Sequence, residues 1–268
     1  MNVIVSLAAL TILDAGPTGQ IRAAAEAGFE AVGLRLNPFV AGDPAIVGHA
    51  ERESEIRRLI AATGLGVMEI GVFPIGAAFD IEPLKPVLAF SAEIGARFIV
   101  CPVEDEDRNR RRAAFARLCD VASPYGLRVL AEFNPYSAMP NLADALALVA
   151  AAARSNGALC IDALHLSRSG GTPADLATVP PALMPLVHFC DARAPDFSKP
   201  PTELRQESRT ARLLPGEGEL PLDDLLAALP SNVVVSVEAP TARDAHFPAV
   251  ERARLARAAT RKVLARHA

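Results

Sequence analysis

Short apolar runs alternate with amphipathic helical patterns along the whole of this 268-residue chain. The runs are rich in Val, Ile, Leu and Phe and predict buried strands, and a segment of helical periodicity follows each of them. Strands that alternate with helices pair in parallel through right-handed crossovers, and eight such units close into a barrel. The predicted strands are 3–7, 31–36, 67–72, 98–103, 129–133, 158–161, 186–189 and 233–238. We expect a long polar loop after 186–189, and we expect His165 to lie in the loop that follows 158–161.

The sequence therefore predicts an α/β fold, a (β/α)8 TIM barrel, in which residues 1–268 form a single domain. The alternative is an open, doubly wound sheet. No glycine-rich dinucleotide fingerprint follows the first predicted strand, so this alternative has little support.

Composition narrows the class of protein. Apolar residues make up 51% of the chain and charged residues 22%, which is enough for a large core. A formal net charge of −4 argues against a broad nucleic-acid surface. The four cysteines form no CxxC pair, and no apolar stretch is long enough to span a bilayer. We expect a cytoplasmic protein with a small-molecule substrate and no nucleic-acid or membrane partner. A homo-oligomer is compatible with this class.

Four consecutive predicted strands each end in a side chain that can bind a metal: Glu132, Asp162, His188 and Glu238. Each alone would more often be a helix cap, an ion-pair partner or a hydrogen-bonded core residue. In a barrel, however, the C-terminal strand ends form the active site, and adjacent strands lie about 4.8 Å apart. The oxygen-rich set suits Mn²⁺ or Mg²⁺, with Co²⁺ or Zn²⁺ tolerated. The sequence therefore predicts a metal site.

The motifs around these residues resemble those of the xylose isomerase-like TIM barrels, proteins of the sugar phosphate isomerase/epimerase type. The resemblance covers essentially the whole chain, and the second half carries the specific motifs. They are Leu-Ala-Glu132-Phe-Asn, Asp162-Ala-Leu-His165-Leu-Ser-Arg168, His188-Phe-Cys-Asp191-Ala-Arg193, Leu-Pro-Gly216-Glu-Gly218-Glu-Leu-Pro and Val-Glu238-Ala-Pro.

The resemblance implies roles for these residues. In that family the four strand-end side chains bind a divalent metal, and the two glutamates also act as the acid/base pair. On this chain the catalytic pair would be Glu132 and Glu238, and His165 and Arg193 would contact substrate oxygens. Asp191 is expected either to orient His188 or to cap the loop that follows it.

One position departs from the family pattern. Relatives usually carry a glutamate in the second strand, where this chain has Gly33, and Arg35 follows on the same face. Exchanging a carboxylate for a guanidinium favours an anionic substrate, such as a carboxylate or phosphate. The alternative is that Arg35 points outward to an acid on a helix. Glu69, on the inner face of the third strand, is expected to bind a substrate hydroxyl or an arginine.

These residues suggest metal-assisted proton transfer next to a carbonyl, through an ene-diolate, with Glu132 and Glu238 as the two proton carriers. The outcome would be epimerisation or isomerisation of a sugar or sugar-derived keto substrate. A related alternative is a dehydratase acting on a dehydroshikimate-like or inosose-like ring. A third is a sugar-binding barrel without catalysis. An endonuclease of this fold would need more histidines than the chain offers.

Overall fold

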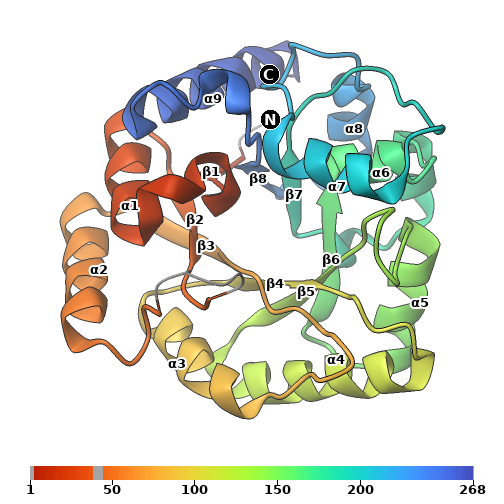
Figure 1. Cartoon of the computed structure of the whole chain (residues 1–268), viewed down its shortest axis with the longest axis horizontal. Coiled ribbons are helices and arrows are strands. Elements are labelled where there is room, and N and C mark those ends of the chain that lie inside the picture. Colours follow the sequence, from red (N-terminus) through yellow and green to blue (C-terminus); the bar gives the residue numbers. More distant parts are fainter. Residues whose placement is uncertain (1–2, 39–44, 268) are drawn as a thin grey trace.

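Eight parallel strands form a closed barrel in strand order, with β1 paired to both β2 and β8 (Figure 1). The structure is a computed structural model that describes residues 3–38 and 45–267. The fold confirms the predicted α/β class and the (β/α)8 TIM barrel. The strands are β1 (Val5–Leu7), β2 (Ala31–Arg35), β3 (Gly66–Gly71), β4 (Phe98–Pro102), β5 (Arg128–Glu132), β6 (Gly157–Asp162), β7 (Leu186–Phe189) and β8 (Val234–Val237).

Helices surround the strands, and the last one, α9, lies beside α1 and completes the ring (Figure 1). Within the described residues, no helix combines the length and apolarity needed to cross a membrane. The helices are α1 (Gly16–Ala27), α2 (Ala50–Thr63), α3 (Lys85–Glu93), α4 (Arg108–Ala122), α5 (Leu142–Ala152), α6 (Ala163–Arg168), α7 (Pro201–Thr210), α8 (Leu222–Ala228) and α9 (Ala249–Leu264).

The core has two parts, because successive side chains of a strand point to opposite faces. Outward-facing residues such as Val129 and Ala131 pack against the helices. Inward-facing residues fill the barrel; they are Ala31, Met68, Phe98, Val100, Leu130, Ala158, Cys160, Leu186 and Val234. The apolar interior thus ends one inward position before the C-terminal ends of β5, β6 and β7.

Two helices lie where the sequence predicts loops. Helix α7 occurs in the segment after β7 that the sequence predicts to be a long polar loop. It was missed because its sequence has no apolar stripe, and Ser208 is its one buried residue. His165, predicted to lie in a loop, belongs to α6, whose N-cap Asp162 accepts a hydrogen bond from the His165 N–H at 2.9 Å.

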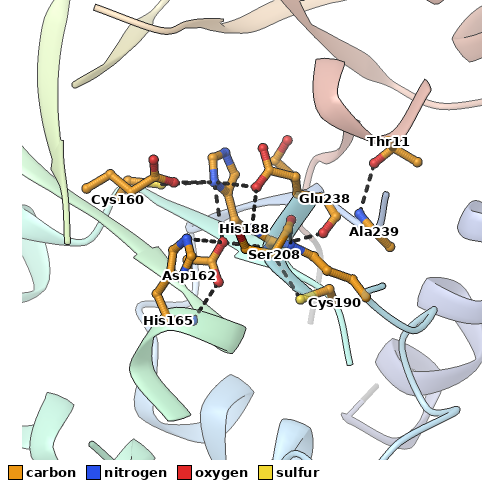
Figure 2. Close-up of polar contacts among 12 residues, drawn as sticks. Thr11, Cys160, Asp162, His165, His188, Cys190, Ser208, Glu238 and Ala239 are labelled. Carbon is orange, nitrogen blue, oxygen red and sulfur yellow. Dashed lines mark hydrogen bonds and ion pairs between the residues drawn. The ribbon is translucent and has the colours of Figure 1, made fainter. Parts of the chain in front are cut away.

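Thr11 ties the segment after β1 to the end of β8 (Figure 2). Its hydroxyl donates a 2.7 Å hydrogen bond to the Val237 carbonyl and accepts a 3.0 Å hydrogen bond from the Ala239 N–H. These two residues flank Glu238, so the buried Thr11 hydroxyl fixes the backbone that carries this side chain.

We predict that Thr11→Val lowers the free energy of unfolding by about 1–3 kcal/mol, because a buried N–H loses its acceptor without a change of side-chain shape. Urea denaturation measures the difference. Thr11→Ser keeps the hydroxyl and serves as the control, with a smaller loss expected. A loss in Thr11→Val no larger than that in Thr11→Ser would contradict this role of the hydrogen bonds, because valine removes only the hydroxyl and serine removes only the methyl group.

Candidate active site

The four predicted chelating side chains converge at the mouth of the barrel. Glu132, Asp162 and His188 each follow an inward-facing apolar residue by two positions, and Glu238 follows Val234 by four, so all four point inward. Each offers a ligand atom, and these atoms lie within 4.8 Å of one another. Figure 2 shows Asp162, His188 and Glu238 side by side. The predicted set is therefore brought together in space.

His188 lies at the centre of this group. Its Nδ1 atom is 2.9 Å from Glu132 Oε1, 3.5 Å from Glu238 Oε2 and 3.9 Å from Asp162 Oδ2. Its Nε2 atom faces the other way, toward Glu69 Oε2 at 3.1 Å. The Cys160 thiol is 3.5 Å from Nδ1, but burial raises its pKa, so the thiol stays protonated and the carboxylates are the better ligands.

The surroundings of Glu132 and Glu238 shift the pKa values of these two side chains in opposite directions. Burial raises the pKa of Glu238 to about 7. Burial acts in the same direction on Glu132, but the hydrogen bond from His188 and the charges of His188 and His165 together outweigh it, so the pKa of Glu132 is lowered below its usual value. Two carboxyl groups with unlike proton affinities are the pattern found in acid/base pairs.

Arg212 is a member of this site that the sequence did not predict. Its side chain is 1% exposed, and its Nη1 atom donates to Asp162 Oδ2 at 2.7 Å. Its Nη2 atom lies 3.0 Å from Glu238 Oε2, and Nε donates to the Ser208 carbonyl at 2.8 Å. Burial opposes ionisation of Asp162, but Arg212 holds the pKa of this carboxyl well below its usual range. Arg212 therefore supplies the positive charge beside the carboxylates.

A cavity of about 250 Å³ opens above these residues. His165 lines it, lies buried beside Asp162 and meets the Tyr136 ring edge-on, with the ring centroids 5.6 Å apart. Arg35 and Glu69 line the same cavity, so Arg35 faces the barrel mouth and not an outer helix. A larger apolar hollow of about 720 Å³ beside α6 and α8 is lined by none of the four candidate metal ligands.

Arg193 lies outside the cavity that contains the other predicted substrate-binding residues. Its side chain is exposed and does not line the cavity, and its carbonyl accepts a 3.0 Å hydrogen bond from Arg168. The chain turns outward here because the preceding Ala192 carbonyl is held by the Glu219 N–H at 2.8 Å. The geometry therefore gives no support to the predicted substrate contact, whereas Arg212 contacts the carboxylates of Asp162 and Glu238 directly.

Asp191 holds a loop and does not orient His188. Its carboxylate accepts backbone hydrogen bonds of 2.8–3.0 Å from Ala192, Gly216, Gly218 and Leu220, and none of its hydrogen bonds within the described residues reaches His188. A Cβ at Gly218 would lie 2.3 Å from the Ala192 carbonyl oxygen. The Gly216–Gly218 segment is thus folded tightly onto the end of β7, in agreement with the capping role predicted as one of two possibilities.

Helix α7 covers one side of the cavity and supplies Arg205, Ser208 and Arg209 to its lining. The helix is fixed by Arg168 of α6, which donates to both carboxylate oxygens of Glu207 at 2.7 and 2.9 Å. Burial would raise the pKa of Glu207, but the hydrogen bonds from Arg168 lower it below its usual value. The pair is largely buried, so it is a firm connection between the two helices.

We predict that Glu207→Gln lowers the free energy of unfolding by about 1–3 kcal/mol at pH 7, because the charge-assisted bonds to Arg168 are lost. The folded-state pKa of Glu207 is lowered, so its stabilisation is complete above the ordinary pKa of 4.5 and disappears as the pH falls through the folded-state value.

Urea denaturation at pH 7 and at about pH 3.5 measures this dependence, and the difference between the two proteins should shrink at the lower pH. Glu203→Gln removes an exposed carboxylate from the same helix and leaves the Arg168–Glu207 hydrogen bonds in place, so it is the control. A difference between wild type and Glu207→Gln that stays constant across this range would contradict the assignment.

Comparisons with known proteins agree with this architecture. The family model described as xylose isomerase-like TIM barrel matches residues 21–263. An inosose isomerase of Bacillus licheniformis is 28% identical over 171 residues, which cover 59% of this chain and 59% of that protein. The chain thus spans about 59% of the length of the curated relatives it matches.

Solved structures show the same fold. The IOLI protein, crystallised with a bound zinc atom, matches with a TM-score of 0.83 at 18% identity, over 98% of both chains. A D-allulose 3-epimerase from Methylomonas sp., in complex with D-allulose, matches with a TM-score of 0.71 at 17% identity, over 97% of this chain and 96% of that one. At these identities the likeness concerns the fold.

Proposed function

Because the chain belongs to the xylose isomerase-like TIM barrel family, we propose that it is a divalent-metal-dependent isomerase or epimerase of a sugar-derived keto substrate. The observation that carries the proposal is the convergence of Glu132, Asp162, His188 and Glu238 on one point at the barrel mouth. The inosose isomerase relative supports a cyclic polyhydroxy ketone as the substrate class.

The donor set fits a divalent cation. Three carboxylates and one imidazole nitrogen come from four neighbouring strand ends, and the Nδ1 atom of His188 already faces the three carboxylates. The oxygen-rich composition favours Mn²⁺ or Mg²⁺, while the zinc atom in the IOLI protein makes Zn²⁺ the main competitor. When bound, such a cation would polarise the substrate carbonyl and stabilise negative charge that develops on its oxygen.

The chain's own residues would move the proton. Glu132 and Glu238 stand on either side of His188, on β5 and at the end of β8. One carboxylate would remove the proton from the hydroxyl-bearing carbon next to the carbonyl. The other would deliver a proton to the opposite face of that carbon, or to the former carbonyl carbon, in which case the hydroxyl proton also passes to the former carbonyl oxygen. The first outcome is epimerisation and the second is isomerisation.

Polar residues around the cavity would hold the substrate. His165 and Arg212 lie beside Asp162 and can donate hydrogen bonds to substrate oxygens. Arg35 and the exposed Arg209 line the outer part of the cavity wall, where a carboxylate or phosphate substituent would find cationic partners. An anionic derivative of a keto sugar therefore belongs in any substrate screen.

The test is proton exchange in D₂O with Mn²⁺, Mg²⁺ or Zn²⁺ and a panel of inososes, D-allulose, ketose phosphates and dehydroshikimate. We expect one substrate to gain a single deuterium beside its carbonyl without losing water. Glu132→Gln and Glu238→Gln should each slow this exchange by about 100-fold or more, because an acid/base group is lost.

Glu106→Gln is the matched control, since Glu106 is an exposed glutamate outside the cavity, and it should exchange like wild type. Loss of water from dehydroshikimate or an inosose would identify a dehydratase in place of an isomerase. Absence of exchange with every metal and substrate, in a protein that still binds a sugar, would indicate a non-catalytic barrel.

A further inference from the structure

Glu69 reaches the candidate metal centre by way of an irregularity in the barrel. In the pairing of β2 with β3, Val32 lies opposite Val67 and Leu34 lies opposite Ile70, so Gly33 faces both Met68 and Glu69. This extra residue in β3 breaks the alternation of the strand, and Met68 and Glu69 both face the interior. Bulges of this kind redirect side chains, often beside active sites.

Gly33 provides the room that Glu69 occupies. A Cβ at this position would lie 2.6 Å from Glu69 Oε1 and 2.7 Å from Glu69 Cγ, distances that real Cβ atoms do not show. The φ of Gly33 is not in the positive region, so the backbone does not require a glycine here. The absence of a side chain at position 33 is therefore explained by the position of the Glu69 carboxylate.

Both oxygens of Glu69 are engaged. Oε2 lies 3.1 Å from His188 Nε2, and Oε1 accepts a 2.6 Å hydrogen bond from the Ser236 hydroxyl. Glu69, His188 and Ser236 are all at most 3% exposed, so this arrangement is shielded from water. A carboxylate that accepts a hydrogen bond from Nε2–H leaves Nδ1 of the same ring to face Glu132, Asp162 and Glu238.

We propose that Glu69 is a positioning residue for the metal centre: it fixes His188 in the tautomer and ring orientation that present Nδ1 to the cation. Gly33 and Ser236 keep the Glu69 carboxylate in place. A carboxylate that hydrogen-bonds the far nitrogen of a ligating histidine raises the basicity of the ligand and commonly contributes 10–100-fold to metal affinity. This role differs from the contact with a substrate hydroxyl or an arginine that the sequence predicts for Glu69, and it rests on the proposed metal centre.

Metal affinity, measured by calorimetry and by competition with a chelator, tests the proposal without requiring a substrate. Glu69→Gln should weaken binding of Mn²⁺ or Zn²⁺ by about 10–100-fold. Gly33→Ala should also weaken it, because the added methyl group displaces the carboxylate. In the Glu69→Ala variant, the same Gly33→Ala change should not lower the metal affinity further, because the carboxylate that it would displace is absent.

This double-mutant cycle distinguishes a positioning role of Glu69 from a general loss of stability. In the second case, the effects of the two substitutions on metal affinity would be additive. A spectroscopic readout accompanies it: in the Zn²⁺-loaded wild type, the Nε2–H proton of His188 should be slow to exchange and far downfield in ¹⁵N-edited NMR spectra, and Glu69→Gln should abolish this signal. Ser236→Ala should have a metal affinity between those of the wild type and Glu69→Gln.

Unchanged metal affinity in Glu69→Gln, or additive effects in the cycle, would overturn the positioning role while leaving the metal centre intact. A lower substrate affinity with unchanged metal affinity would overturn it as well and restore the substrate contact. Failure of the wild-type protein to bind any divalent cation would overturn the proposed function and this inference together.

Discussion

The structure depends on burying several carboxylates at one end of an apolar barrel. Glu69, Glu132, Asp162 and Glu238 are each at most 9% exposed, and an isolated ionised carboxylate in such a place is costly. Arg212 and His188 provide the compensation that the protein itself can offer, through contacts of 2.7–3.1 Å. Negative groups still outnumber positive ones, which is the electrostatic condition that a divalent cation satisfies.

The rest of the fold places these compensating groups. Arg212 follows α7, so its position depends on the Arg168–Glu207 pair that fixes α7 over the cavity. The backbone around Glu238 is held by Thr11, and the end of β7 is held by Asp191 and the Gly216–Gly218 segment. Each connection joins residues far apart in the sequence, and each ends within a few residues of a candidate metal ligand.

The sequence was sufficient to predict the barrel and to place the four candidate metal ligands at its mouth, for a simple reason. Their strands have regular alternation, so a carboxylate or imidazole placed two residues after an inward-facing Leu or Cys must also face inward. The same regularity could not reveal how Glu69 is placed, because a bulge breaks the alternation of β3 and only the pairing with Gly33 shows it.

The sequence could not reveal the position of Arg212 or the presence of helix α7, for a different reason. The segment between β7 and β8 contains several arginines without an apolar stripe, and the arginine that turns inward is determined by where α7 packs. Arg193 was the natural choice because it follows the β7 motif directly. The turn at Ala192 sends it outward, and that turn is made by a hydrogen bond from Glu219, 27 residues later in the chain.

The proposed binding of one divalent cation by Glu132, Asp162, His188 and Glu238 can be observed in crystals of the protein grown with Mn²⁺. Diffraction data would be collected on both sides of the manganese absorption edge. We expect a single anomalous peak per chain, surrounded by these four side chains, with His188 contributing Nδ1 and its Nε2 still directed at Glu69. A peak at another place, or no peak at saturating Mn²⁺, would show that these residues do not form the metal centre.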